Sequence, residues 1–236
     1  MTITPRRLAV LASGSGSNLQ AILEYLEALG SAAPAAVVLV ASNRAGALAL
    51  ERAGARRIAT EHIVEPTDGA ALRALLARHE VDMIALAGYL KFVPSEVTGA
   101  WRGAIVNIHP ALLPKFGGPG MYGSAVHQAV IDAHERESGA TVHFVDDHYD
   151  RGAAIARSRV PVARGDSVER LAARVLAVEQ TLYPRAVHAV AAGWISLDGD
   201  GRAVVSDRSA LATQFQTSAF PIEFLATPPF ARPPSP

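Results

Sequence analysis

Short apolar runs alternate along most of the chain with segments whose apolar residues recur every three or four positions. The runs have the length of buried strands, and the periodic segments have the spacing of amphipathic helices. Strands are expected at 8–12, 36–42, 82–88, 104–109, 140–146 and 154–162. Helices are expected at 18–29, 45–55, 70–79, 123–135 and 167–192. This alternation predicts an α/β fold, a doubly wound and mostly parallel sheet with helices on both faces.

The last forty or so residues break this alternation. The segment 194–207 predicts a C-terminal hairpin around Gly199, Asp200 and Gly201. The segment 227–236 is rich in proline and is expected to be flexible. We therefore expect one domain over residues 1–207 and a C-terminal extension without chemistry over 208–236.

Composition excludes several classes of protein. Half of the 236 residues are hydrophobic, enough for one sizeable domain or two small ones. Lys and Arg number 22 and so do Asp and Glu, which argues against a nucleic-acid or anionic-membrane surface. The absence of cysteine excludes disulfides, thiolate catalysis and Cys-based zinc sites. With no bilayer-length apolar run and no signal peptide in the sequence, we expect a cytoplasmic protein.

The first strand is followed by a glycine-rich turn, LASGSGSNLQ at 11–20. Free amides and the dipole at the start of a helix favour an anion there. A dinucleotide would need a glycine where Leu19 stands and an acid after the second strand, which ends in ASNR at 41–44. A phosphate monoester fits best, and a tight turn that binds nothing is the alternative. The residues that would line the anion pocket are Ser15, Gly16, Ser17 and Asn18.

The run IVNIHPALLP at 105–114 ends a strand with two polar residues, Asn107 and His109. Residues two apart on a strand point the same way, and Pro110 cannot continue the ladder. At the carboxyl end of a parallel strand, Asn107 can donate to an oxyanion and His109 can supply a proton near neutral pH. A buried histidine that is satisfied by a carbonyl is the alternative.

An acidic loop follows the strand at 140–146. A carboxylate beside an imidazole orients it and raises its pKa, and Asp146, Asp147 and Asp150 are all candidates for that partner. A solvated acidic turn is the alternative. The side chains available to a metal are His143, Asp146, Asp147, His148 and Asp150. Their spacing matches no familiar metal motif, so no metal is expected.

Five stretches, in order, resemble the phosphoribosylglycinamide formyltransferase family, folate-dependent enzymes of purine synthesis. They are SGSGSNLQAIL from Ser13, LAGYLKFVP from Leu86, NIHPALLPKF from Asn107, GATVHFVDDHYDRGAAI from Gly139 and ARVLAVEQTLYP from Ala173. The resemblance covers about residues 7–193. The Asn-x-His-Pro-x-Leu-Leu-Pro run is specific to folate formyltransferases, and the Gly-Ser-Gly-Ser-Asn loop indicates the glycinamide ribonucleotide members. The resemblance implies a Rossmann-like formyltransferase domain over residues 1–207.

The resemblance also implies roles for matching residues. The catalytic trio would be Asn107, His109 and Asp150. The substrate-binding residues would be Ser15, Gly16, Ser17 and Asn18 at the phosphate and Glu179 at the glycinamide. The residues expected at the co-substrate, 10-formyltetrahydrofolate, are Leu90, Lys91, Phe92, Val93, Asn107 and Asp146.

The implied reaction moves a formyl group from 10-formyltetrahydrofolate to the amine of 5-phosphoribosylglycinamide, by direct attack through a tetrahedral intermediate. A folate-dependent enzyme that formylates another amine, such as an amino sugar nucleotide, is the first alternative. A non-catalytic binding module is the second, and intact Asn107, His109 and Asp150 argue against it. The expected partners are small molecules only, with no nucleic acid and no membrane, and the chain would be a monomer or a homodimer.

The chain departs from the family pattern at three places. Lys91 stands where an arginine is common. The segment after Pro114 is longer than in the shorter members, so we expect loop 116–124 to reshape the rim of the site, with no assigned role for His127. Around Pro66 and Thr67 there is no arginine for the folate tail.

Overall fold

The computed structural model describes residues 4–215 and 220–226, and the segment 227–236, expected to be flexible, lies outside them. The strands are β1 (Arg6–Leu11), β2 (Ala35–Ser42), β3 (Ala59–His62), β4 (Met83–Leu86), β5 (Ile105–His109), β6 (Glu137–Phe144), β7 (Ala154–Pro161), β8 (Ile195–Leu197), β9 (Ala203–Val205) and β10 (Glu223–Phe224). The helices are α1 (Ser17–Leu29), η1 (Gly30–Ala32), α2 (Leu48–Ala55), α3 (Gly69–Arg78), α4 (Ser95–Ala100), α5 (Ser124–Asp132), α6 (Val168–Ala191) and α7 (Arg208–Phe215).

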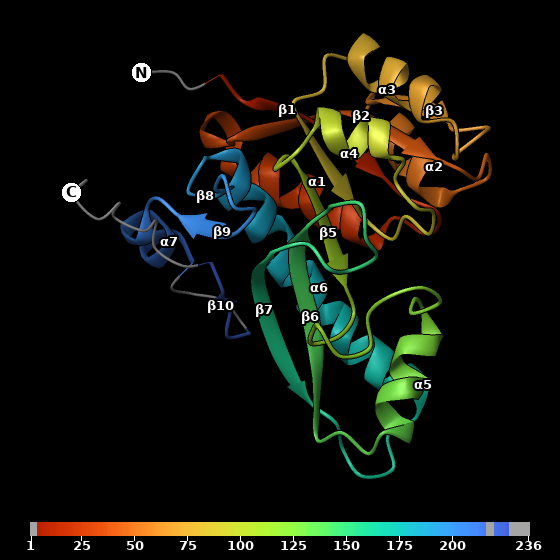
Figure 1. Cartoon of the computed structure of the whole chain (residues 1–236), viewed down its shortest axis with the longest axis vertical. Coiled ribbons are helices and arrows are strands. Elements are labelled where there is room, and N and C mark those ends of the chain that lie inside the picture. The colour runs from red at the N-terminus through yellow and green to blue at the C-terminus, as the bar shows by residue number, and fades with distance from the viewer. Residues whose placement is uncertain (1–3, 216–219, 227–236) are drawn as a thin grey trace.

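Eight strands form one twisted sheet in the order β10-β7-β6-β5-β4-β1-β2-β3 (Figure 1). The five strands from β3 to β5 are parallel, and β6, β7 and β10 join antiparallel at the other side. β8 and β9 form a separate two-stranded hairpin. The prediction of a mostly parallel sheet with a C-terminal hairpin is confirmed.

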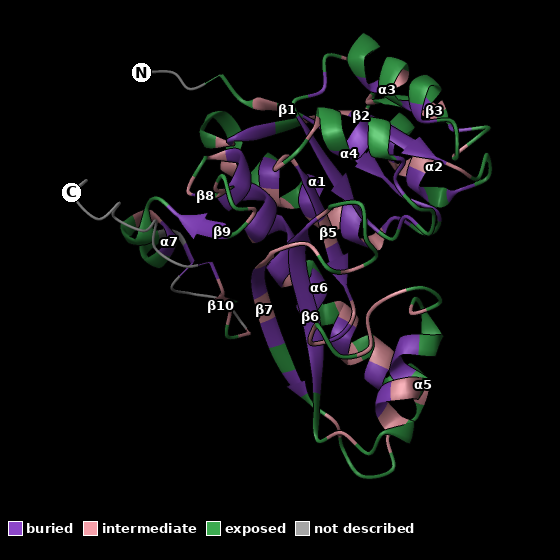
Figure 2. Ribbon diagram, viewed as in Figure 1, coloured by how far each residue is buried: buried purple, intermediate pink, exposed green. Residues whose placement is uncertain are grey.

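Helices cover both faces of the sheet because the side chains of a strand alternate between them. In β1, Leu8 and Val10 point into the core beneath α1 and α6, and Ala9 and Leu11 point into the core beneath α3 and α4. All four are fully buried, and the central strands of the sheet are mostly purple in Figure 2. Both apolar faces of the strand therefore stabilise the fold, which explains its continuous apolar run.

Tyr183 on α6 links this helix to the two strands at the centre of the sheet. Its side chain is fully buried, and its hydroxyl lies 2.9 Å from the carbonyl oxygen of Leu86 and 3.0 Å from that of Val106. Leu86 ends β4 and Val106 lies in β5, so one buried hydroxyl contacts both strands just before their carboxyl ends.

The described residues after 207 pack on the same body. Leu211 and Phe215 of α7 are buried in the core that contains α6, and β10 pairs with β7, where the Arg157 guanidinium donates to Glu223 at 2.7 and 2.8 Å. α7, β8 and β9 lie at the left side of the molecule, away from α5 at the lower right (Figure 1). The division of the chain at residue 207 stays a prediction.

Within the described ranges, no helix combines the length and apolar character needed to cross a membrane.

Candidate active site

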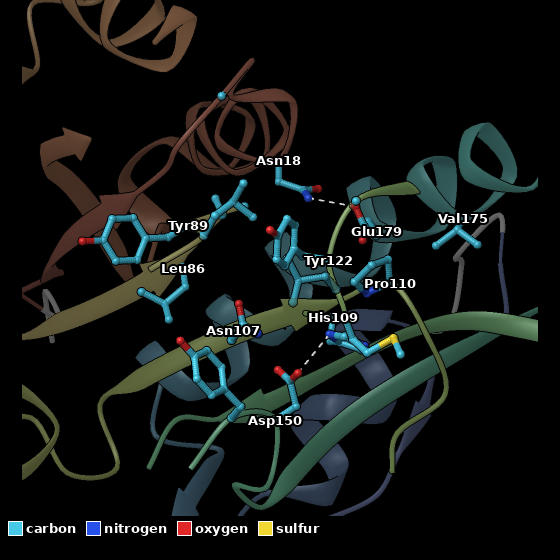
Figure 3. A pocket seen from close by; sticks show the side chains of 18 of the residues that line it. Asn18, Leu86, Tyr89, Asn107, His109, Pro110, Tyr122, Asp150, Val175 and Glu179 are labelled. Carbon is cyan, nitrogen blue, oxygen red and sulfur yellow. Dashed lines mark hydrogen bonds and ion pairs between the residues drawn. The ribbon is translucent and has the colours of Figure 1, made fainter. Parts of the chain in front are cut away.

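A cavity of about 610 Å³ opens at the carboxyl ends of β4 and β5, between the start of α1 and the side of α6 (Figure 3). Every residue proposed from the sequence for catalysis or binding lines it. These residues are Ser15, Gly16, Ser17, Asn18, Leu90, Lys91, Phe92, Val93, Asn107, His109, Asp146, Asp150 and Glu179. Segments far apart in the chain therefore meet at one site.

The anion loop depends on Gly16. This residue has φ 71°, and a Cβ added to it would lie 2.8 Å from the Cα of Ala49, so only glycine fits. α1 has no side-chain cap and no acid in its first turn, which leaves its first amides free for an anion. The Ser13 hydroxyl donates to Asn43 Oδ1 at 2.6 Å and accepts from the Leu90 amide at 2.9 Å. The loop is thereby attached to the segment proposed to hold folate.

Glu179 is a buried carboxyl beside this loop. Asn18 Nδ2 donates to its Oε2 at 2.9 Å, and both side chains are 8% exposed. Burial raises the pKa of Glu179 to about 7, although the bond from Asn18 acts in the opposite direction. Asn18 Oδ1 has no partner among the described residues, so this pair presents both an acceptor and a titratable group to the cavity.

Asp150 lies between two histidines. Its Oδ2 is 3.5 Å from His109 Nδ1, its Oδ1 is 3.6 Å from His143 Nε2, and the Gly118 amide donates to Oδ2 at 2.9 Å. Burial raises the pKa of Asp150, but His143, His109 and Gly118 together outweigh it, so the net pKa is below the usual value. Asp150 also has φ 53°, a left-handed conformation that few residues other than glycine adopt. The carboxylate is thus held ionised beside His109.

His109 is only 3% exposed, and its Nε2 lies 2.8 Å from the carbonyl oxygen of Phe116. A carbonyl can only accept, so the hydrogen-bond network assigns the proton to Nε2 and leaves Nδ1 for Asp150 and the cavity. Burial lowers the pKa of His109 and outweighs the raising effects of Asp150 and Phe116; His143 lowers it further. The expected raising effect of the carboxylate is present, but the net shift is downward.

Asn107 is oriented by His143, its cross-strand neighbour. His143 Nδ1 lies 2.7 Å from the carbonyl oxygen of Phe144, which assigns the proton to Nδ1. Nε2 therefore accepts from Asn107 Nδ2 at 3.0 Å, and the second N–H of that amide remains for a ligand. Sequence reasoning considered His143 only as a metal ligand. The clue to its role is that two polar residues, one on each strand, lie opposite each other. This pairing can be recognised only once the strand register is known.

The route by which Asp150 reaches His109 differs from expectation. β6 is antiparallel to β5, so its last residue, Phe144, pairs with Val106 rather than with the carboxyl end of β5. The chain between β6 and β7 then doubles back to bring Asp150 beside His109. Gly152 allows this return, because any Cβ there would collide with the carbonyl of Phe144.

The three candidate acids have separate surroundings. Asp147 accepts a hydrogen bond from the Thr98 hydroxyl, and Asp146 accepts from the His148 amide at 2.8 Å. Of the three acids, Asp150 is the one paired with His109. Within the described chain, no group of three or more His, Asp or Glu side chains is arranged to hold a metal ion.

Aromatic side chains border the part of the cavity proposed for folate. The rings of Phe92 and Tyr149 lie 5.0 Å apart, and both are more than a third exposed. Tyr122, from the longer loop, is also exposed and lies between Asn18 and His109 in Figure 3. Sequence reasoning assigned no role to Tyr149 or Tyr122, because an exposed aromatic in a loop has no periodic signal.

His127, at the first turn of α5, also lines the cavity. It is 5% exposed, its Nδ1 has no partner among the described residues, and burial and nearby His109 lower its pKa.

An α/β sheet whose cavity joins an anion loop to an amide, an imidazole and a carboxylate is the arrangement of an enzyme that transfers an acyl group. The family model described as formyl transferase matches residues 6–187, and the chain belongs to that family.

Named relatives and a solved structure agree with this assignment. A chloroplastic phosphoribosylglycinamide formyltransferase of Vigna unguiculata is 41% identical over 213 residues, which are 88% of this chain and 68% of that protein. The trifunctional purine biosynthetic protein adenosine-3 of Chironomus tentans is 35% identical over 204 residues, 84% of this chain but only 14% of that protein. The crystal structure of glycinamide ribonucleotide transformylase 1 from Symbiobacterium toebii has a TM-score of 0.78 at 37% identity, covering 86% of this chain and 95% of that one.

Proposed function

We propose that this chain transfers a formyl group from 10-formyltetrahydrofolate to the amine of 5-phosphoribosylglycinamide, in de novo purine synthesis. The observation that supports this most is one cavity that joins a helix-start anion loop to Asn107, His109 and Asp150. A phosphate-bearing amine and a folate would then meet at the carboxyl end of β5.

The bound folate supplies the formyl group. An apolar rim of Leu90, Phe92 and Tyr149, each more than a third exposed, suits the rings of that co-substrate. Val93 is buried beside them, so the backbone of this segment is fixed against the core. Lys91 and Asp146 also line the cavity, where they would contact polar groups of the co-substrate.

Attack of the amine on the formyl carbon places negative charge on the formyl oxygen. The free N–H of Asn107 and the Nδ1 of protonated His109 are the donors proposed to stabilise it. Loss of one such donor typically costs about 3 kcal/mol of barrier. Nδ1 takes this role because the Phe116 carbonyl already occupies Nε2, and because Asp150 Oδ2, 3.5 Å from Nδ1, acts on the ring by its charge rather than through a hydrogen bond. Negative charge beside the ring favours its protonated form, opposing the effect of burial.

Asp150 stabilises the imidazolium and orients it. Its depressed pKa keeps the carboxylate ionised, and the Gly118 amide fixes one of its oxygens. We assign to Asp150 and His109, with water, the transfer of a proton from the attacking amine toward the leaving nitrogen. No covalent intermediate with the enzyme is required, which suits a chain without cysteine.

The substrate phosphate would bind the free amides of Gly16, Ser17 and Asn18, away from the reacting carbon. Binding energy there holds the amine in position, which lowers the entropic part of the barrier. Glu179, which accepts a hydrogen bond from Asn18 and lines the cavity, would accept hydrogen bonds from the glycinamide part.

Substrate identity is tested by incubating the chain with 10-formyltetrahydrofolate and one of two acceptors. With 5-phosphoribosylglycinamide, we expect release of tetrahydrofolate and a product heavier by one formyl group in place of hydrogen, measured by absorbance and mass spectrometry. An amino sugar nucleotide should give neither signal. Transfer to the amino sugar alone would overturn the proposal.

A cytoplasmic location and a monomeric or homodimeric state remain predictions.

A further inference from the structure

The cavity has an unfavourable charge balance for a phosphate. Lys91 is the single Lys or Arg among the described residues that line it. Four carboxyl groups line it as well, those of Asp146, Asp150, Glu169 and Glu179. The start of α1 supplies only about half a positive charge, whereas a phosphate monoester carries nearly two negative charges at neutral pH. A further cation behind the anion loop would correct this imbalance.

Arg52 on α2 has the required position. Its Nε donates to the carbonyl oxygen of Ser15 at 2.8 Å, and its Nη1 donates to Gln20 Oε1 at 3.2 Å. Ala49, one turn earlier on the same helix, donates its amide to Gly14 at 3.2 Å and limits residue 16 to glycine. α2 thus packs against the side of the loop that faces away from the cavity.

The charge of Arg52 is also uncompensated. No carboxylate of the described chain forms an ion pair with it. Arg56, the residue that follows α2, instead pairs with Glu27 at 2.9 Å. It also donates to Gln20 Oε1 at 3.4 Å, but it forms no hydrogen bond to the described backbone of the loop. The two arginines therefore differ in the properties that matter for an anion: contact with the loop and a free charge.

We propose that Arg52 is a positioning residue for the substrate phosphate, an inference that rests on the proposed function and extends it. Its guanidinium holds the Ser15 carbonyl oxygen turned away from the anion, so that the amides of Gly16, Ser17 and Asn18 face the cavity. Its positive charge then acts on the phosphate through the loop, without direct contact. The arrangement makes the loop selective for a dianion over an uncharged group of similar size.

Kinetics of Arg52→Gln, Arg52→Lys and the control Arg56→Gln test this role. For Arg52→Gln, we expect the KM for 5-phosphoribosylglycinamide to rise roughly tenfold or more, from loss of one nearby charge. The kcat and the KM for 10-formyltetrahydrofolate should stay near wild type. Arg52→Lys keeps the charge and should recover most of the affinity, and Arg56→Gln should resemble wild type.

A binding measurement separates this inference from the proposed function. Calorimetric titration with ribose 5-phosphate should show binding that weakens with added salt in wild type and Arg56→Gln, and that is much weaker in Arg52→Gln. If this holds but no formyl transfer occurs, only the proposed function fails. If transfer occurs and Arg52→Gln matches Arg56→Gln in both experiments, the inference is wrong. It is also wrong if Arg52→Gln changes kcat and both KM values together, as general damage to the site would.

Discussion

At the level of single residues, the carboxylate of Asp150 lies beside two histidines. It faces His109 through one oxygen and His143 through the other, and His143 in turn orients Asn107. In the proposed mechanism, the three residues recognised from the sequence would act with a fourth, His143, whose contact with Asn107 follows from the strand register. This shared carboxylate makes the protonation of His109 depend directly on Asp150.

Replacement of Asp150 by Asn tests that dependence. We expect kcat to fall by about 10²-fold or more, because the imidazolium loses its stabilising charge. Asp150 raises the pKa of His109, so its loss should move the alkaline limb of the kcat profile to lower pH. Tetrahydrofolate release measured across pH gives both quantities. Asp147→Asn is the control, since Asp147 bonds Thr98 instead. An alkaline limb at the same pH in Asp150→Asn would contradict the pairing.

The buried carboxyl of Glu179 makes the stability of the fold depend on pH. Its pKa is raised from 4.5 to about 7 in the folded chain, so the folded state holds its proton more tightly. Stability from this group is complete below about pH 4.5 and is lost as pH rises through about 7. The shift corresponds to up to about 3 kcal/mol.

Glu179→Gln should therefore be more stable than wild type at pH 8, and the difference should vanish toward pH 5. Chemical denaturation at both pH values measures it. The same variant should raise the KM for 5-phosphoribosylglycinamide at pH 8, because Gln replaces an anionic acceptor. Equal stability of the two proteins at pH 8 would show that the carboxyl is not held in a desolvated site.

At the scale of elements, strands with strong apolar runs were predictable and polar or short ones were not. β1, β2 and β5 each contain consecutive buried residues. β3, with the sequence ATEH at the edge of the sheet, has no apolar pattern, and α4 has only six residues. The direction of each strand could not be predicted from the sequence either. β6 resembles a buried parallel strand because both of its faces are covered, yet it is antiparallel to β5.

The contact of α6 with β4 and β5 can be tested by replacing Tyr183. Tyr183→Phe leaves two buried carbonyls without their hydroxyl partner and should lower stability by about 1–3 kcal/mol. Because Leu86 leads into the proposed folate segment, the KM for 10-formyltetrahydrofolate should also rise. Tyr25→Phe is the control: Tyr25 lies on α1, and its hydroxyl is 3.0 Å from His188 Nδ1. A KM change of equal size in both variants would contradict this specific link.

At the level of the whole molecule, the α/β architecture can be predicted from the alternation of apolar runs with helical segments. The packing of the C-terminal residues into the core cannot. Phe215 stacks on Phe224 at 5.7 Å and contacts the rings of Trp194 and His188. These contacts join α7, β10 and the residues next to the hairpin to α6. The sequence of α7 has little periodicity, so only the tertiary contacts identify it as core.

Phe215→Ala tests whether this region folds with the rest. Removing a buried aromatic side chain should cost about 3–5 kcal/mol and lower Tm in a single transition, with kcat unchanged at a temperature well below unfolding. Thermal unfolding followed by circular dichroism measures the first effect. Two separate transitions, or an unchanged Tm, would instead indicate an independent extension.

The proposed reaction requires Asn107, His109 and Asp150 to act together on one formyl carbon. Its most direct test is the kcat for transfer to 5-phosphoribosylglycinamide at saturating concentrations of both substrates, for wild type and His109→Ala. We expect transfer by wild type and a loss of about 10²-fold or more in the variant, with unchanged circular dichroism and Tm within a few degrees. Near wild-type turnover by a folded His109→Ala protein would contradict it.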